Sequence, residues 1–223
     1  MKQLYIIFLV LIPALSTAQD DSKFRVDFLG ETFITQVNGK YGMIDPDSNI
    51  LIPHEYEAIY PDGGFTITKK DGKLGIFKLG QGVIFLPNEY EEIERDGSFI
   101  KTKKEGKYGL LHLDGKVLIP NEYEKMSKDG AFIYVTKNGK MGLYNLKGKL
   151  LINTEFESLK ADGGVVLTQK ESKFGLVSRK GKLILPNDFD FIDLTPNEAR
   201  ASKAGIIEGY NIKKYNKGYV YSF

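Results

Sequence analysis

The chain has no cysteine and no tryptophan, and only two of its 223 residues are histidine. The absence of cysteine excludes a disulfide scaffold and any zinc site built on thiolates. It also excludes lipid attachment to a cysteine at the N-terminus of a processed chain. Basic residues exceed acidic ones by only two, so net charge alone gives no strong attraction to nucleic acid. Stability must therefore come from packing and from backbone hydrogen bonds.

Long hydrophobic runs are also lacking. The longest extends from Leu4 to Leu15 and is interrupted by Pro13, which is too short for the roughly twenty residues that a transmembrane helix needs. It follows Lys2 and precedes Ser16, Thr17 and Ala18, the small residues that are typical of a cleavage site. The sequence therefore predicts a signal peptide over residues 1–18. We expect an exported protein, periplasmic or at the cell surface, with no transmembrane span in the mature chain.

The sequence contains no useful stretch of the 3.6-residue hydrophobic period of helices. Its period is about 33 residues. A glycine that follows a large side chain recurs at 33 or 34 residue intervals, and these glycines are Gly42, Gly75, Gly109, Gly142 and Gly175. A second column follows about eleven residues later, with Ile-Pro-x-Glu-Tyr as its commonest form. Two columns in one phase indicate internal repeats.

Each repeat is predicted to be three or four short antiparallel strands. Runs such as Phe65–Thr68 favour strands because they are rich in β-branched and aromatic residues. Asn38-Gly39, Asp71-Gly72 and Asn138-Gly139 are hairpin signals, since both central residues of a type I′ turn have positive φ. Prolines such as Pro53 and Pro120 are expected to end the third strand. The Asp-Gly dipeptides at 62–63, 96–97, 129–130 and 162–163 are predicted to be turns between repeats.

These patterns predict an all-β fold, a tandem array of about five antiparallel β units in a solenoid-like or coiled sheet. The alternative is a closed five-bladed propeller, although 33 residues are few for a four-stranded blade. The predicted organisation is a signal peptide (1–18), an N-terminal cap (19–30), five β repeats (31–194) and an irregular C-terminal cap (195–223). Caps are expected because a repeat array must protect its exposed edges.

The order Gly-Lys-x-Gly-apolar followed by Ile-Pro-x-x-Tyr resembles the WG-repeat family, also called KWG repeats, which occurs largely in bacterial proteins. The tryptophan of that family is replaced here by Tyr41, Leu74, Tyr108, Met141 and Phe174. The resemblance covers about three quarters of the mature chain. It implies a β-rich repeat with a structural or binding role and brings no established catalytic activity.

Two neighbouring columns are the candidate ligand-facing residues. The aromatic column is Tyr56, Tyr90, Tyr123, Phe156 and Phe189, and the acidic column is Glu55, Glu89, Glu122, Glu155 and Asp188. Aromatic faces beside polar groups suit sugars and peptides. The alternative is that the rings pack in the core and the carboxylates form a solvated surface. In that case the acidic column would offset a basic column formed by Lys40, Lys73, Lys107, Lys140 and Lys173.

Catalytic, metal and cofactor sites are not expected. His54 and His112 occupy polar positions that other repeats fill with different residues, which predicts exposed side chains. Ser98-x-x-Lys101 has the spacing of serine acyl-enzymes but lacks their partner motifs. A hydrolase built on Asp193, Glu198 and Arg200 remains a minor alternative.

The expected function is therefore a non-catalytic, exported module that presents a periodic β surface to a protein or glycan of the cell envelope. The alternative is a structural spacer of the envelope that associates with its own copies.

Overall fold

The computed structural model describes residues 24–27, 31–62, 64–78 and 83–215, which form 23 strands in six antiparallel sheets. The predicted signal peptide lies outside the described residues. The prediction of an all-β repeat protein is confirmed. Among the residues described, no helix is both long and apolar enough to cross a membrane.

Five sheets have four strands each and are formed by chain-adjacent strands. Sheet 1 contains β1 (Phe24–Asp27), β2 (Glu31–Val37), β3 (Lys40–Ile44) and β4 (Ile50–Tyr56). Sheet 2 contains β5 (Ala58–Asp62), β6 (Phe65–Lys70), β7 (Lys73–Lys78) and β8 (Val83–Tyr90). Sheet 3 contains β9 (Glu92–Asp96), β10 (Phe99–Lys104), β11 (Lys107–His112) and β12 (Val117–Tyr123).

Sheet 4 contains β13 (Lys125–Asp129), β14 (Phe132–Lys137), β15 (Lys140–Asn145) and β16 (Leu150–Phe156). Sheet 5 contains β17 (Ser158–Asp162), β18 (Val165–Lys170), β19 (Lys173–Ser178) and β20 (Leu183–Phe189). Sheet 6 has three described strands, β21 (Phe191–Leu194), β22 (Glu198–Lys203) and β23 (Ile206–Asn211). The segment predicted to be an irregular C-terminal cap therefore contains a regular hairpin, and the predicted N-terminal cap contains the first strand of sheet 1.

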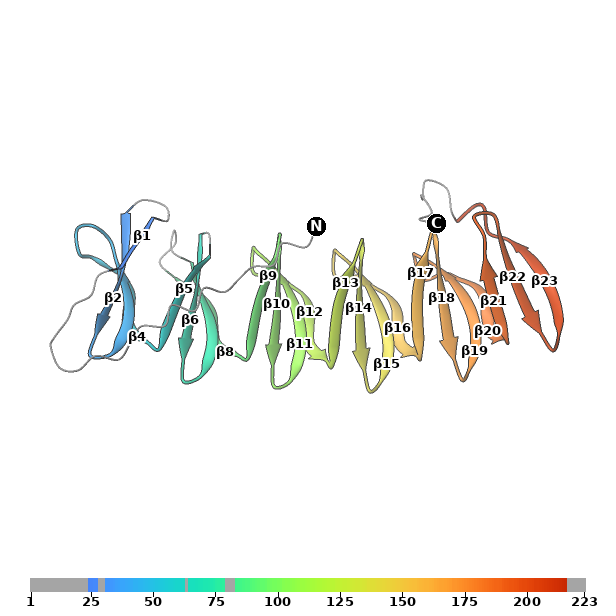
Figure 1. The fold of residues 1–223 in the computed structure, drawn as a ribbon, viewed down its shortest axis with the longest axis horizontal. Coiled ribbons are helices and arrows are strands. Elements are labelled where there is room, and N and C mark those ends of the chain that lie inside the picture. Colours follow the sequence, from blue (N-terminus) through green and yellow to red (C-terminus); the bar gives the residue numbers. More distant parts are fainter. Residues whose placement is uncertain (1–23, 28–30, 63, 79–82, 216–223) are drawn as a thin grey trace.

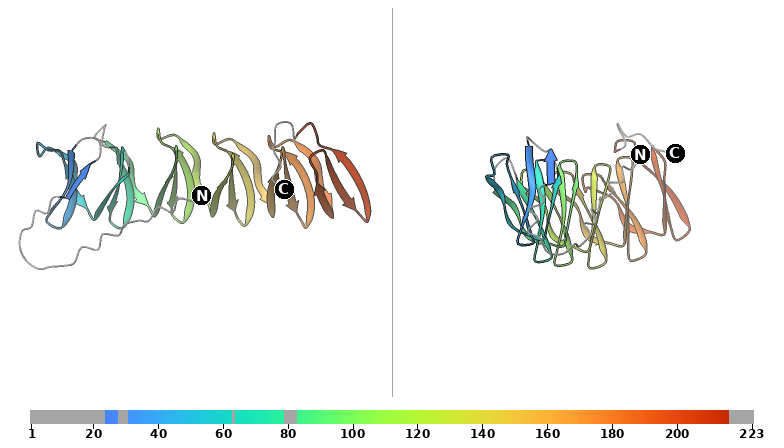
Figure 2. Two further views of the ribbon diagram at one scale, coloured as in Figure 1. Left: turned by 45° about the horizontal axis from the view of Figure 1, so that its top comes forward. Right: turned by 60° about the vertical axis from the view of Figure 1, so that its left-hand side comes forward.

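The six sheets stand one behind another in a single row, with sheets 1 and 6 at opposite ends (Figures 1 and 2). The third and fourth strands of each sheet contact the first and second strands of the next. This arrangement is the expected elongated array, and the chain does not close into the alternative propeller.

The core is divided into five hydrophobic clusters, each between two neighbouring sheets. Between sheets 3 and 4, for example, Leu110, Ile119 and Tyr123 pack against Ile133 and Tyr144. A single sheet therefore cannot bury its apolar face alone, which is the usual reason for stacking in repeat proteins.

The predicted I′ hairpins are confirmed, because Asn38 and Gly39 have φ of 49° and 76° and the equivalent pairs have similar values. The predicted boundary between repeats is wrong. Asp96 pairs with Phe99 across Gly97 and Ser98, so this turn joins β9 and β10 within one sheet. Neighbouring sheets are instead joined by a single residue in a bend, such as Glu91 between β8 and β9.

The prolines do not end the third strand of the predicted repeat. Pro53, Pro87, Pro120 and Pro186 lie inside β4, β8, β12 and β20, which are the outer strands of their sheets. A proline is tolerated there because the N–H it lacks would point away from the neighbouring strand.

The recurrent glycines lie where the third and fourth strands cross closely. A Cβ on Gly109 would lie 2.7 Å from Cγ and 2.9 Å from the backbone N of Asn121. The ladder has a bulge at this point. The Asn121 amide donates to the carbonyls of Thr102 (3.1 Å) and Lys107 (3.0 Å), and it accepts from the Thr102 hydroxyl (3.2 Å). Asn88 and Asn187 do the same in sheets 2 and 5. The side-chain amide thus satisfies backbone groups that the bulge leaves unpaired.

Candidate functional site

The predicted aromatic column lies in the core. Tyr56 is 2% exposed and Tyr123 is 4% exposed, Phe156 and Phe189 are also buried, and Tyr90 is half-buried. The Tyr123 hydroxyl is 2.6 Å from that of Tyr144. Burial, followed by this hydrogen bond, raises the pKa of Tyr123. These rings hold neighbouring sheets together, so a ligand on the surface meets the carboxylates beside them and not the ring faces.

The acidic column is on or near the surface, and each member pairs with a lysine that starts the next hairpin turn. These ion pairs are Glu55–Lys70, Glu89–Lys104, Glu122–Lys137, Glu155–Lys170 and Asp188–Lys203. The column is therefore neutralised along its length. A partner would therefore meet a row of ion pairs, which it can exchange for its own charged groups, rather than a continuous negative surface.

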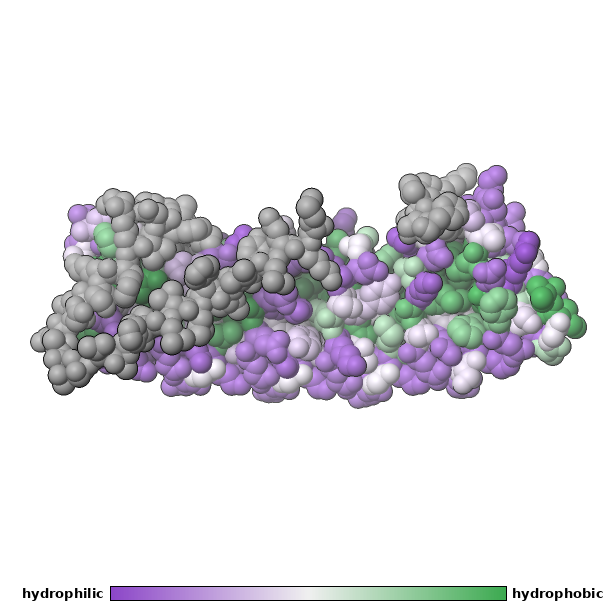
Figure 3. All heavy atoms as spheres, in the orientation of Figure 1, coloured by the Kyte–Doolittle hydropathy of each residue, from purple (hydrophilic) through white to green (hydrophobic). Residues whose placement is uncertain are grey.

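Lys73, Lys107, Lys140 and Lys173 of the predicted basic column pair with a different set of acids, those at the joints between sheets. Lys107 Nζ is 3.4 Å from Glu124 and Lys140 Nζ is 3.4 Å from Glu157. Glu124 also accepts from the backbone N–H groups of Asn138 (3.0 Å) and Gly139 (3.2 Å). Each such carboxylate therefore binds a lysine of its own sheet and the hairpin turn of the next sheet. We call each of these carboxylates, together with the lysine and the hairpin turn that it binds, a clasp. The clasps lie along the hydrophilic lower margin in Figure 3, where these hairpins turn.

Four of the joint carboxylates, Glu91, Glu124, Glu157 and Asp190, have a lowered pKa and are held in the charged form. Backbone hydrogen bonds are the main cause of the lowered pKa of Glu91, Glu124 and Glu157. In Asp190 the Lys173 hydrogen bond is the larger cause of a lowered pKa.

Acidification is expected to destabilise the array through these clasps. A carboxyl whose pKa is lower in the folded chain adds stability above its unfolded value, which is 4.5 for Glu124. That contribution is lost as the pH falls through the lowered folded value. We expect the melting temperature to fall between about pH 5 and about pH 3. The triple variant Glu91→Gln, Glu124→Gln, Glu157→Gln should melt lower at neutral pH and show a shallower fall. Identical pH profiles for the two proteins would contradict this role.

The other predicted polar residues have ordinary structural partners. His54 is half-buried rather than exposed, and its Nε2 lies 2.6 Å from the Thr35 hydroxyl. His112, at the end of β11 in sheet 3, lies beside Asp114. Arg200 pairs with Glu198. Within the described part of the chain, no group of three or more His, Asp or Glu side chains could hold a metal ion.

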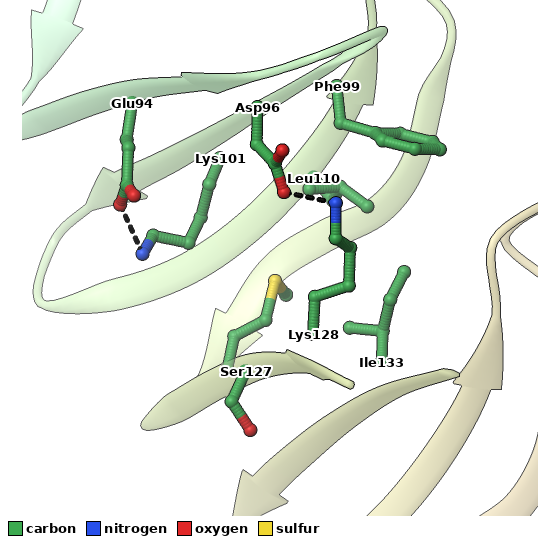
Figure 4. A pocket seen from close by; sticks show the side chains of 9 residues that line it. Glu94, Asp96, Phe99, Lys101, Leu110, Ser127, Lys128 and Ile133 are labelled. Carbon is green, nitrogen blue, oxygen red and sulfur yellow. Dashed lines mark ion pairs between the residues drawn. The ribbon is translucent and has the colours of Figure 1, made fainter. Parts of the chain in front are cut away.

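A cavity of about 240 Å³ lies between sheets 3 and 4 (Figure 4). Its apolar lining is Phe99, Leu110, Met126 and Ile133. Two ion pairs, Lys101–Glu94 and Lys128–Asp96, also line it. Lys128 Nζ is in addition 5.8 Å from the centre of the Phe99 ring. The cavity has the size of a large side chain and is smaller than a typical small-molecule site.

The cavity arises at a residue that departs from the repeat. At the third position of the second strand, sheets 2, 4 and 5 have Ile67, Tyr134 and Leu167, which pack against the clusters between sheets. Sheet 3 has Lys101 there, and this side chain turns outward to Glu94 (Figure 4). Lys101 was singled out above only through Ser98-x-x-Lys101, and its departure from the apolar column was not predicted, although it is visible when Phe-Thr-Ile-Thr (65–68) is compared with Phe-Ile-Lys-Thr (99–102).

Residues 41–73 match the family model described as the WG containing repeat. The expected resemblance to the WG-repeat family is confirmed over these residues. The match runs from Tyr41 in β3 to Lys73 in β7, so the WG repeat of the sequence begins in one sheet and ends in the next. No curated protein is significantly similar to the chain.

The solved structures that match the chain share little sequence with it. PorZ, a surface component of the type-IX secretion system of Porphyromonas gingivalis, is 9% identical, with a TM-score of 0.27 over 81% of this chain and 31% of PorZ. The chain thus spans about a third of PorZ. Kluyveromyces lactis Hsv2p is 9% identical, with a TM-score of 0.32 over 85% of this chain and 74% of Hsv2p. The WD40 β-propeller domain of Doa1 is 13% identical, with a TM-score of 0.26 over 84% of this chain and 76% of that domain.

Proposed function

We propose that this protein is an exported, non-catalytic binding module that takes a large apolar side chain of a protein partner into the cavity between sheets 3 and 4. The observation that carries the proposal is Lys101, which replaces the apolar filler of sheets 2, 4 and 5 and leaves the space open. The apolar floor supplies binding energy through the removal of hydrophobic surface from water.

The rim of the cavity suits a polypeptide. Lys101–Glu94 and Lys128–Asp96 are partly exposed pairs, and such pairs contribute at most about 1 kcal/mol each. A partner can therefore exchange them for its own charged or backbone groups at little cost. Buried aromatic rings favour a protein partner over a glycan, because sugars bind to exposed ring faces.

Filling the cavity is expected to abolish binding. The variant Lys101→Tyr introduces the residue that sheet 4 has at this position, Tyr134, whose hydroxyl accepts from the N–H of Ala161 (3.2 Å). The fold should therefore tolerate it. Linear peptides selected from a displayed random library on the chain 19–223 should carry a large apolar residue, and their affinity for Lys101→Tyr should fall at least about tenfold.

The matched control is Lys104→Tyr, three residues away on the same strand and paired with Glu89. Its affinity for the selected peptides should equal that of the unchanged chain. Equal binding by Lys101→Tyr, or selection of no peptide, would refute the proposal. Retention of the chain on the insoluble polysaccharide of its own cell envelope, unaffected by Lys101→Tyr, would favour the glycan alternative.

A further inference from the structure

Sheet 6 has an open edge. Each of the other five sheets places a fourth strand beside its third strand, whereas in the described residues no strand pairs with the outer side of β23. Ile206 and Ile207 of β23 are 67% and 66% exposed, the highest values among the large hydrophobic side chains described. An open, apolar edge is a surface that recruits another strand.

The outer strands of sheets 1, 2, 3 and 5 each carry a proline that hinders such pairing, whereas β23, like β16 (Leu150–Phe156) of sheet 4, carries none. Pro53, Pro87, Pro120 and Pro186 are all exposed on the outer strands of sheets 1, 2, 3 and 5. Proline offers no N–H to an incoming strand. β23 contains no proline and no lysine.

A strand of the kind found in the other sheets does not fit this edge. In sheet 5 the fourth strand crosses closely over Gly175 and places Asn187 against Thr168. One period later these positions are Glu208 and Ala201. The side chain of Glu208 therefore prevents the close approach that glycine permits. Ala201 lacks the hydroxyl to which Asn187 bonds in sheet 5. The edge accepts a regular antiparallel strand without a bulge.

The backbone groups that face outward follow from the hairpin. Lys203 pairs with Ile206 across the turn at Ala204 and Gly205, whose φ angles are 49° and 80°. Residues flanking a two-residue turn form a hydrogen-bonded pair, and such pairs alternate along an antiparallel ladder. The N–H and C=O groups of Ile207, Gly209 and Asn211 therefore point away from β22.

This outer edge is complementary to itself. If two copies of β23 pair about a two-fold axis at Gly209, Ile207 of each copy lies opposite Asn211 of the other. All three outward-facing residues of each copy then meet a hydrogen-bonding partner. The same register places Glu208 opposite Tyr210 of the other copy, two groups that already bond within one chain. A register centred on Glu208 would oppose two like charges, which is unfavourable.

We propose that the chain forms a two-fold dimer in which β23 of one copy pairs antiparallel with β23 of a second copy, centred on Gly209. The pairing joins two copies of sheet 6 into one six-stranded sheet and leaves the cavity between sheets 3 and 4 free on both. This interface goes beyond the proposed binding function and does not depend on it. It is an isologous contact, so assembly closes at two copies.

The test is sedimentation equilibrium of the chain 19–223 over a range of concentrations. The unchanged chain should fit a monomer–dimer equilibrium. Gly209→Pro removes the central outward N–H, and Ile207→Lys places a charge on the edge, so each should raise the dissociation constant at least about tenfold. Ile207→Lys also serves if the proline variant fails to fold, as judged by far-UV circular dichroism.

The matched control is Leu183→Lys, a substitution of a residue that is 61% exposed on the proline-protected outer strand β20. It should leave the dissociation constant unchanged. A chain that stays monomeric throughout, a dimer that persists in the folded variants, or growth beyond two copies would each overturn the proposal.

Discussion

Replacing Tyr123 by alanine is expected to lower the free energy of unfolding by about 3–5 kcal/mol, the usual cost of deleting a buried aromatic ring. Tyr123 belongs to the cluster between sheets 3 and 4, with Leu110, Ile119 and Ile133 around it. The ring also meets that of Tyr144 edge to face, at 5.9 Å between centres. Denaturant unfolding followed by circular dichroism measures the loss.

Two further variants measure separately the contributions of the Tyr123 hydroxyl and of Glu122, the preceding residue. Tyr123→Phe keeps the ring and leaves the Tyr144 hydroxyl without its partner, so we expect a smaller loss of about 1–3 kcal/mol. Glu122→Ala removes only the partly exposed pair with Lys137, which is worth at most about 1 kcal/mol. A Tyr123→Ala protein as stable as the unchanged chain would contradict the assignment of this column to the core.

The turns were the most predictable part of the fold. Asn-Gly and Asp-Gly encode positive φ locally, and Asn138 and Gly139 adopt it at 52° and 71°. The boundary between repeats was not predictable in the same way, because a periodic sequence has no origin. Any starting point gives the same period, and only the strand pairing shows that the chain passes from one sheet to the next at residues such as Glu91 and Glu124.

The candidate columns show a similar limit. Glu122 and Tyr123 are adjacent in a strand, so their side chains point to opposite faces. The sequence therefore indicates that one of the pair is buried, and both readings of the tyrosine were open until the stacking of the sheets was known. The cavity depends on Lys101, at a position where sheets 2, 4 and 5 have Ile67, Tyr134 and Leu167. A search for recurrent residues overlooks such a position because it does not recur.

The regular recurrence of the glycines has a steric cause, which substitution of Gly109 tests. Gly109→Ala is expected to lower the free energy of unfolding by about 2–4 kcal/mol. The new methyl group would lie 2.7 to 2.9 Å from atoms of Asn121, one of them in the backbone, so the fourth strand must move. That movement also strains the bonds from the Asn121 amide to Thr102 and Lys107. Denaturant unfolding measures the effect.

A double-mutant cycle with Asn121→Ala distinguishes the clash from a general cost of the added methyl group. Asn121→Ala alone leaves the buried Thr102 hydroxyl and two carbonyls without their side-chain partner, which should cost about 1–3 kcal/mol. In the double variant the side-chain part of the clash is gone, so the combined loss should be smaller than the sum of the two. Strict additivity would mean that the glycine column is needed only for the backbone approach of the fourth strand and not for the amide that lies over it.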